Sequence, residues 1–311
     1  MNKNNFKLSI IIPVYNEEEG IKAFFKELKK FLPQDYEVIF VDDGSTDKTL
    51  SLVKEIGSKN KNIRYFSLRR HQGKAEALTI GFQKSKGDFV LTIDADLQDR
   101  PDQIGKLQKK INEEWDMVSG WRNERKDSPY KKLTSKLFNL MASAFWGLKL
   151  NDLNCGLKLY RKGAAKSLNL YGGLHRFIPI LLHQEGFRVT EVPVVHDVRK
   201  FGKSKYTFMK VFTDIPDMFT MLFLSKYSNR PLHFFWLIGL IFGLLGFLIL
   251  FYLSIIWLQG ESIGRRPLLI FGVLFTLAGI QVFFTGFLAD LFISGTKSNK
   301  SEEVMVKEQS D

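Results

Sequence analysis

The sequence predicts an open α/β sheet with helices on both faces, followed by two helices that span a membrane. Over residues 1–200, short apolar runs alternate with stretches of helical periodicity, which is typical of α/β folds. Each of the first five apolar runs is followed at once by a cluster of polar residues, and two long runs without charge lie near the end of the chain. A chain of 311 residues has room for one large domain with appended membrane elements.

The apolar runs predict strands, because each is short and bounded by turn residues. In chain order these strands are Leu8–Ile12, Glu37–Val41, Ile63–Ser67, Phe89–Ile93, Asp116–Ser119, Gly156–Tyr160 and Arg188–Val194. The periodic stretches between the early strands predict helices over Glu18–Phe31, Thr46–Ile56, Lys74–Gln83 and Gln103–Glu113. Helix starts carry capping residues, such as Asp47 after Ser45-Thr46.

The most informative motif is Asp94-Ala95-Asp96, which directly follows the strand predicted over Phe89–Ile93. Residues i and i+2 of an extended segment point the same way, so we expect Asp94 and Asp96 to present their carboxylates together. Open α/β sheets bind ligands at the carboxyl ends of their strands. Two carboxylates at that edge suit a hard divalent cation, which takes its other ligands from water and a diphosphate.

Polar clusters follow the other early strands as well. They are Pro13-Val14-Tyr15-Asn16-Glu17, Asp42-Asp43-Gly44-Ser45-Thr46-Asp47, Arg69-Arg70 with Gly73-Lys74, and Trp121-Arg122 with Arg125. Five clusters at one edge of a sheet predict a single ligand site. A Gly-x-Gly-x-x-Gly motif does not follow the first strand, so a nicotinamide or flavin site is not supported.

The net charge of +12 predicts an anionic partner, which could be nucleic acid, a phosphate-rich substrate or an acidic membrane surface. Nucleic acid is disfavoured, because the charge does not form a basic strip interleaved with aromatic residues and the long apolar runs would go unexplained. The single cysteine, Cys155, excludes an intramolecular disulfide framework and a cysteine-rich zinc site.

The two charge-free runs, 234–258 and 268–289, each exceed the roughly 20 residues that cross a bilayer. They predict a transmembrane hairpin with helices over about 232–258 and 268–293. Because the first residues lack a secretory signal, we expect the domain over 1–205 to stay in the cytoplasm. An even number of spans returns Lys297 and Lys300 to that side. The tail over 295–311 is polar and is expected to be disordered.

The segment 206–230 connects the domain to the hairpin. Its apolar and polar residues alternate with helical spacing that is broken at Pro216, which fits two short amphipathic helices in the membrane interface. The alternative is a helix that packs on the large domain.

Taken together, these motifs resemble the family 2 glycosyltransferases, whose fold is the GT-A nucleotide-diphospho-sugar-binding sheet. A closer resemblance is to the polyprenyl-phosphate glycosyltransferases, which include dolichol-phosphate mannose synthase and bacterial undecaprenyl-phosphate glucosyltransferases. The residues that carry it are Asp94-Ala95-Asp96-Leu97-Gln98-Asp99, Asn154-Cys155-Gly156-Leu157-Lys158, His175-Arg176-Phe177-Ile178-Pro179 and Arg199-Lys200-Phe201-Gly202-Lys203-Ser204-Lys205-Tyr206. One departure is Arg100, where relatives of the mannose synthase usually have a second proline.

The resemblance implies roles for individual residues in binding the donor. Base and ribose would be held by Pro13, Tyr15, Glu17 and Asp43, and the rest of the nucleotide sugar would be bound by Lys74, Asp94, Ala95 and Lys205. A Mg²⁺ or Mn²⁺ ion would be bound by Asp94, Asp96 and Gln98. Two alternatives stay open: Asp42 could hold its turn, and Lys74 could simply be a cation at the start of a helix.

The expected nucleophile, a lipid phosphate, is mostly ionised at pH 7, so the reaction does not require a general base. Cationic side chains must instead overcome the repulsion between two phosphate-bearing substrates. Together with Asp96, the predicted catalytic residues are Arg122 and Arg199, with Lys205 beside them. The segment from Arg199 to Tyr206 could close over the donor at Gly202, or it could be a basic stretch attracted to anionic lipid.

Acceptor binding is assigned to Arg122, His175 and Arg176, although a structural hydrogen bond is the preferred interpretation for His175 alone. The predicted reaction is an inverting, metal-dependent transfer of a hexose to a polyprenyl phosphate such as undecaprenyl phosphate, for modification of a cell-envelope glycan. UDP-glucose is the first choice of donor, ahead of GDP-mannose and aminoarabinose-type sugars. The enzyme is expected in the inner (plasma) membrane, and a homo-tetramer is implied by the resemblance.

Two other functions share some of these features. A processive polysaccharide synthase shares the donor site, but two spans are too few for a polymer channel and the chain contains no Gln-x-x-Arg-Trp motif. A catalytically inactive membrane sensor of sugar nucleotides would show a broken Asp-x-Asp motif or would lack the loop around Arg199, and both are intact.

Overall fold

The computed structural model describes residues 7–123, 146–197, 231–264 and 266–296. The chain divides into two compact units, Met1–Asp217 and Met218–Asp311. The predicted interfacial helices over 206–230 lie outside the described residues, as do Arg125, Arg199, Lys205 and the tail from 297 onward. The predicted borders of the domain at 205 and of the hairpin at 230 therefore remain expectations.

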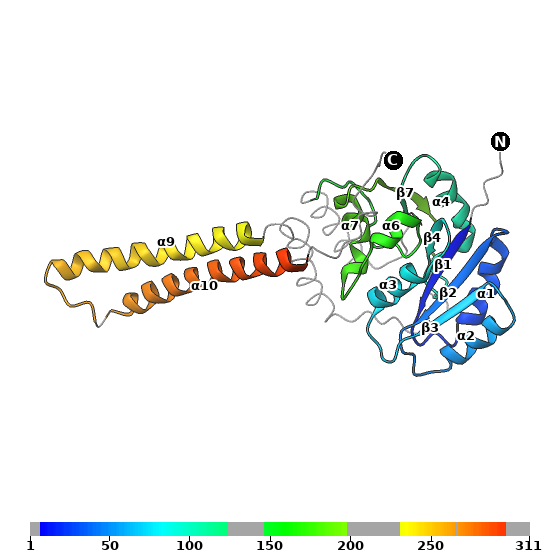
Figure 1. Cartoon of the computed structure of the whole chain (residues 1–311), viewed down its shortest axis with the longest axis horizontal. Coiled ribbons are helices and arrows are strands. Elements are labelled where there is room, and N and C mark those ends of the chain that lie inside the picture. The colour runs from blue at the N-terminus through cyan, green and yellow to red at the C-terminus, as the bar shows by residue number, and fades with distance from the viewer. Residues whose placement is uncertain (1–6, 124–145, 198–230, 265, 297–311) are drawn as a thin grey trace. The chain divides into compact units, whose positions relative to one another are not determined.

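The described part of the first unit contains a seven-stranded sheet in the order β3-β2-β1-β4-β6-β5-β7 (Figure 1). The strands are β1 (Leu8–Val14), β2 (Tyr36–Asp42), β3 (Ile63–Ser67), β4 (Phe89–Thr92), β5 (Met117–Arg122), β6 (Lys158–Arg161) and β7 (Val189–Val194). All the predicted strands are present. Pairing is parallel from β3 to β4 and between β5 and β7, whereas β6 runs antiparallel to both of its neighbours.

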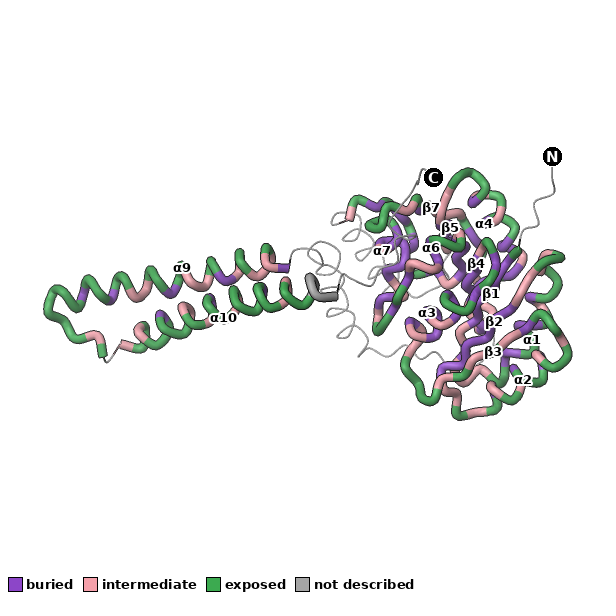
Figure 2. The backbone as a smooth tube through the Cα atoms, viewed as in Figure 1, coloured by how far each residue is buried: buried purple, intermediate pink, exposed green. Residues whose placement is uncertain are grey.

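Helices cover both faces of this sheet, as predicted. They are α1 (Ile21–Leu28), α2 (Thr49–Ser58), α3 (Lys74–Lys84), α4 (Ile104–Ile111), α6 (Lys162–Ser167) and α7 (Ile178–Gln184), with 3₁₀ turns η1 (Lys29–Phe31), η2 (Pro101–Gln103) and η3 (Leu174–Arg176). Strand β1 explains the arrangement, because it is apolar on both sides. Ile10 and Ile12 belong to the core cluster that includes α1, α2 and α4, while Ile11 lies against Gly81 of α3 on the other face. The central strands β1, β2 and β4 are mostly buried, whereas the edge strands β3 and β7 are more exposed (Figure 2).

Helices α1 and α2 begin later than the sequence pattern predicted, at Ile21 and Thr49. Side chains in the preceding turns are the reason. The Thr46 amide donates to Asn16 Oδ1 (2.8 Å), which ties the turn after β1 to the turn after β2. Within the second turn, the Thr49 amide donates to Asp47 Oδ1 (2.9 Å). Residues 46–48 thus form a loop at the sheet edge and not the first turn of a helix.

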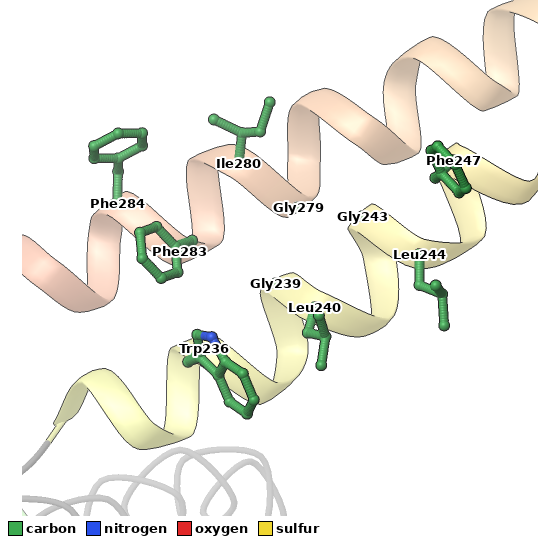
Figure 3. Close-up of a pocket in the computed structure, with 10 residues that line it drawn as sticks. All are labelled: Trp236, Gly239, Leu240, Gly243, Leu244, Phe247, Gly279, Ile280, Phe283 and Phe284. Atoms are coloured by element: carbon green, nitrogen blue, oxygen red, sulfur yellow. The ribbon is translucent and has the colours of Figure 1, made fainter. Parts of the chain in front are cut away.

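The second unit contains the predicted hairpin, formed by α9 (Pro231–Leu258) and α10 (Pro267–Thr296). Both helices are long and apolar enough to cross a membrane, and only 11% of each apolar window is buried. Core helices of a globular domain are mostly buried, so this low burial favours membrane spans. The helices approach closely at their glycines, since a Cβ on Gly279 would lie 2.6 Å from the Gly243 amide nitrogen. Trp236, Phe283 and Phe284 line a shallow apolar groove beside this contact (Figure 3).

Candidate active site

The candidate site lies where β1, β2 and β4 end at the same edge of the sheet. These strands are parallel, and β1 pairs with β2 on one side and with β4 on the other. The chain therefore continues in opposite directions from β1, which makes this edge a topological switch point of the kind that binds ligands in α/β folds. The motifs that follow the three strands are brought together here.

Asp42, the last residue of β2, holds its own turn. Its side chain is buried, its Oδ1 accepts from the Ser45 amide (3.1 Å), and its Oδ2 accepts from the Ser67 hydroxyl at the end of β3 (2.7 Å). The turn also requires Gly44, whose φ is +70° and whose added Cβ would lie 2.6 Å from the Arg70 carbonyl carbon. Asp42 thus has a structural set of partners.

Asp43 faces the segment that follows β3. Its Oδ1 accepts from the Gln72 amide (2.8 Å) and its Oδ2 from the Gly73 amide (2.9 Å). The His71 Nδ1 lies 2.8 Å from the same Oδ2. The His71 ring is stacked on Tyr15, with ring centroids 4.0 Å apart and planes 14° apart. The two residues predicted to bind a base, Tyr15 and Asp43, are therefore adjacent and share His71 as a partner that sequence reasoning missed.

Pro13 and Glu17 lie at the same edge. Pro13 is opposite Val41 in the β1–β2 register. The Glu17 amide donates to Thr49 Oγ1 (2.8 Å), which fixes the turn after β1 to the start of α2. Both residues are half-buried, and they flank Tyr15 as the sequence predicted.

Asp94 is paired with Lys74, the first residue of α3. The Lys74 Nζ lies 2.5 and 2.7 Å from the two Asp94 carboxylate oxygens. Burial opposes the charged form of both groups, but their attraction outweighs it: the pKa of Asp94 is lowered and that of Lys74 is raised. Lys74 is thus a counter-ion of the Asp-x-Asp motif, and it is about one-third exposed, with 34% of its side chain accessible.

The backbone around the motif differs from the expectation. Strand β4 ends at Thr92, and Ala95 and Asp96 form a turn followed by Leu97 with φ +59°. Asp96 Oδ1 accepts from the Gln98 amide (3.1 Å). Asp94 and Asp96 therefore do not lie in one extended segment, contrary to the prediction, because β4 pairs with β1 only as far as Thr92.

Gly156 lies beneath two carboxylates of this site. An added Cβ would lie 2.7 Å from Asp94 Oδ2 and 2.5 Å from Asp99 Oδ2. Asp99 is buried, and its Oδ1 lies 3.2 Å from the His196 Nδ1. Because Gly156 has no side chain, the carboxylates of Asp94 and Asp99 can both lie against its backbone.

Lys158 supplies a second buried cation that sequence reasoning did not assign to the site. It lies opposite Thr92 in the β4–β6 register, and its Nζ donates to the Cys155 carbonyl. Burial lowers the pKa of Lys158, and the charge of Lys74 lowers it further. The clue in the sequence was a lysine inside a predicted strand, where an apolar residue is usual.

The predicted metal ligands are oxygen donors, the type that Mg²⁺ and Mn²⁺ prefer. Among the described residues, no group of three or more His, Cys, Asp or Glu side chains is arranged to hold a metal. The Gln98 side-chain amide donates to the Asp197 carbonyl at 3.4 Å. Asp94, Asp96 and Gln98 supply oxygen atoms of the type that such a cation prefers, and in the free chain Lys74 neutralises the Asp94 carboxylate.

Arg122, at the end of β5, makes a two-pronged ion pair. Its Nε and Nη2 donate to the Asp152 carboxylate at 2.6 and 2.9 Å, and Asp152 is 1% exposed. Burial alone would lower the pKa of Arg122, but the Asp152 carboxylate raises it well above its usual value. The guanidinium is thus rigidly placed, and Asp152 is a partner that the sequence did not indicate.

His175 and Arg176 lie in η3, which precedes α7. His175 Nδ1 lies 3.4 Å from the Gly172 carbonyl oxygen. Burial and the nearby charges of Lys74 and Arg176 lower the pKa of His175 to about 3, so the ring is neutral at pH 7. Since Lys74 and Asp94 both influence it, His175 is close to the Asp-x-Asp motif.

Comparison with known proteins decides the family. The model of the family described as glycosyl transferase family 2 matches residues 9–168, which include every motif described above up to Lys158. The chain belongs to glycosyl transferase family 2. It is therefore a glycosyltransferase, and the resemblance seen in the sequence is confirmed.

Two relatives within this family match nearly the whole chain. The dodecaprenyl-phosphate galacturonate synthase of Rhizobium johnstonii is 35% identical over 92% of this chain and 88% of the relative. The undecaprenyl-phosphate 4-deoxy-4-formamido-L-arabinose transferase of Photorhabdus laumondii subsp. laumondii is 33% identical over 91% of this chain and 88% of the relative. Both matches are too long to be confined to the family domain.

A solved structure confirms the fold. Glucosyl-3-phosphoglycerate synthase from Mycobacterium tuberculosis, in complex with Mn²⁺, UDP-glucose and phosphoglyceric acid, superposes with a TM-score of 0.53 and 19% identity. The match covers 71% of this chain and 79% of that chain. The sheet described here is thus the predicted GT-A sheet.

Proposed function

We propose that this glycosyltransferase moves a sugar from a nucleotide sugar to a polyprenyl phosphate. The observation that carries the proposal is that one chain combines the acidic edge of a GT-A sheet with two apolar helices long enough to cross a membrane. A water-soluble donor and a lipid acceptor need these two parts. The names of both near-full-length relatives contain a polyprenyl phosphate, which supports the same acceptor class.

The donor site would be the edge at β1, β2 and β4. Tyr15 and Asp43, with Pro13 and Glu17 beside them, would take the base and ribose, and Ala95 would lie along the donor. UDP-glucose remains our first choice of donor. The names of the two relatives contain galacturonate and a formamido-arabinose, so the nucleotide forms of these sugars belong in the same test.

Asp94, Asp96 and the side-chain oxygen of Gln98 would hold Mg²⁺ or Mn²⁺, whose charge stabilises the departing diphosphate. Lys74 has a linked role in this proposal. Its ammonium neutralises Asp94 at 2.5 Å in the free chain, and it turns to a diphosphate oxygen when the donor binds. Lys158 and the Gly156 position keep the carboxylates together beneath the donor.

In the transfer step, an ionised oxygen of the lipid phosphate attacks the anomeric carbon of the sugar. The bond from that carbon to the diphosphate oxygen breaks, and its electron pair leaves with the nucleoside diphosphate. Direct displacement inverts the anomeric centre. Arg199 and Lys205 would hold the reacting phosphates, and Arg122, fixed by Asp152, would present charge to the acceptor beside His175 and Arg176.

In the cell, the hairpin would lie in the inner (plasma) membrane and the domain over 1–205 in the cytoplasm, with 206–230 in the membrane interface. The lipid-linked product would serve a cell-envelope glycan, and the enzyme would assemble as a homo-tetramer. Protease protection of membranes tests the cytoplasmic position of the domain, and the mass of the detergent-solubilised protein tests the tetramer.

The test is to incubate membranes that contain the full chain with undecaprenyl phosphate and a panel of radiolabelled nucleotide sugars. We expect label from one donor to enter the organic phase as a lipid carrying one sugar, β-linked when the donor is α-linked. Organic-phase label from none of the donors would contradict the proposal, and an α-linked product by NMR would contradict inversion. A water-soluble polymer would favour the processive synthase.

A further inference from the structure

The contacts of His71 reproduce the contacts expected of a nucleotide base. The imidazole ring lies flat on Tyr15, with centroids 4.0 Å apart and an interplanar angle of 14°. Its Nδ1 lies 2.8 Å from Asp43 Oδ2. A planar ring on Tyr15 and an N–H directed at Asp43 are also what a pyrimidine base, with its ring N–H, would offer to the same two side chains.

We infer that His71 is an internal substitute for the base: it occupies the base subsite in the free enzyme and must leave before the donor binds. The inference rests on the proposed assignment of Tyr15 and Asp43 to the base. His71 would then help to determine specificity, because each base must compete with the His71 imidazole for the same subsite.

Asp43 is arranged so that this exchange leaves it fully hydrogen-bonded. It is buried, and its Oδ1 and Oδ2 accept from the backbone amides of Gln72 and Gly73, which are separate donors from the His71 side chain. A base N–H can therefore replace the His71 N–H at Oδ2 without a change in the number of donors. A buried carboxylate that lost a donor without replacement would be strongly disfavoured.

His71 can move while its backbone stays in place. The backbone at Arg70 and His71 is held against Gly44, where an added Cβ would lie 2.7 Å from the His71 amide nitrogen. The His71 side chain, by contrast, is 53% exposed. An exposed ring stack and an exposed ion pair are each weak, so together they cost an incoming base about three- to tenfold in affinity.

The experiment compares the affinity of the full chain in detergent for UDP and for pyrophosphate, by calorimetry at a fixed Mg²⁺ concentration. The variants are His71→Ala, which removes the substitute, and His71→Phe, which keeps a ring for Tyr15 but has no N–H for Asp43. His183→Ala is the matched control, because His183 is an exposed histidine on α7.

We expect His71→Ala to bind UDP about three- to tenfold more tightly than the unchanged chain. His71→Phe should fall between the two, and His183→Ala should match the unchanged chain. Pyrophosphate, which has no base, should bind all four proteins equally.

Equal or weaker UDP binding by His71→Ala would overturn the inference, since it would make His71 a bystander or a partner of the bound base. A gain for pyrophosphate as large as the gain for UDP would also overturn it. If the unchanged chain and every variant fail to bind UDP while they bind pyrophosphate, the proposed assignment of the base site is wrong and the inference is wrong with it.

Discussion

Two pairs of acidic residues follow strands of the sheet, Asp42-Asp43 after β2 and Asp94 with Asp96 after β4. The two pairs differ in the groups that contact their carboxylates. Asp42 and Asp43 accept from backbone amides of Ser45, Gln72 and Gly73, which belong to the turns themselves. Asp94 is held by the ammonium of Lys74, at the end of a flexible side chain. Asp42 and Asp43 keep their backbone donors unless the loops unfold. The ammonium that contacts Asp94 can move away, so another cation can take its place.

The comparison shows that two carboxylates after a strand do not identify a cation site by themselves. In the Asp42-Asp43 turn the carboxylates accept hydrogen bonds from backbone N–H groups. These bonds also hold the backbone in place around Gly44. The Asp94 side combines carboxylates with side-chain cations, Lys74 and the buried Lys158. A carboxylate neutralised by a side-chain cation is the better candidate for a metal that arrives with its substrate.

The largest expected effect is on catalysis. We expect Asp96→Ala to abolish sugar transfer while the protein stays folded in detergent, because the cation would lose one of its two carboxylates. Activity is measured as lipid-linked product, and folding is checked by the thermal unfolding midpoint. Wild-type turnover by this variant, or full activity in EDTA, would remove the distinction between the two acidic pairs.

Cations outside the described residues should have the next largest effect. Arg199→Ala is expected to lower kcat/KM by about ten- to a hundredfold in neutral detergent, the value of one charge-assisted contact with a phosphate, about 1.5–3 kcal/mol. Lys205→Ala should behave similarly, and Lys200→Ala and Lys203→Ala serve as matched controls with small effects. Equal, small losses for all four variants that fade as salt rises would mean that this segment only attracts the membrane surface.

For the free energy of unfolding, we expect the opposite order: a change at Asp42 should cost more than a change at Asp94. Asp42→Ala leaves the Ser45 amide and the Ser67 hydroxyl without their acceptor, so we expect the free energy of unfolding to fall by about 1–3 kcal/mol. Asp94→Ala removes the main partner of Lys74, which is partly exposed and can be solvated by water, so the free energy of unfolding should fall by less. Denaturant unfolding of the full chain in detergent gives both values. A larger loss for Asp94→Ala would reverse our assignment of structural and functional carboxylates.

The smallest effect concerns pH. The pKa of His175 is lowered to about 3 by burial and by Lys74 and Arg176, whereas an unfolded histidine titrates near 6.5. Between pH 6.5 and pH 3 the unfolded chain therefore binds a proton at this histidine and the folded chain does not. The stability contributed by neutral His175 is present above pH 6.5 and is lost as the pH falls towards 3. We expect His175→Gln to lose less stability between pH 7 and pH 5 than the unchanged chain, with His183→Gln as control. The same loss in both variants would contradict the lowered pKa of His175.

The sequence was a good guide to what depends on local pattern. The strand runs, the order of the motifs along the sheet edge and the apolar hairpin all follow from short-range periodicity, and each is present. The turn at Ala95 and Asp96 was missed, because the end of β4 depends on where its pairing with β1 stops. Antiparallel β6, inserted between β4 and β5, was equally invisible in a pattern of apolar residues.

Partners far apart in the chain could not be predicted at all. Asp152 meets Arg122, His71 covers Tyr15, and Gly156 lies beneath Asp94 and Asp99 only after the sheet has formed. A sequence pattern names the residue that carries a charge, whereas its neutralising partner is set by the fold. The sequence therefore names the polar residues at the edge where β1, β2 and β4 end, whereas the partners that neutralise their charges depend on the fold.

We propose that Asp94 exchanges the Lys74 ammonium for a divalent metal when the donor binds, whereas Asp42 keeps its partners in the turn. The most direct measurement is the binding of Mn²⁺ to the full chain in the presence of UDP, followed by electron paramagnetic resonance as the loss of the free-ion signal. We predict that Asp94→Asn, which keeps the shape of the side chain and removes its charge, abolishes this binding, while Asp42→Ala retains it. If Asp94→Asn binds Mn²⁺ as tightly as the unchanged chain does, Asp94 is not a ligand of the metal.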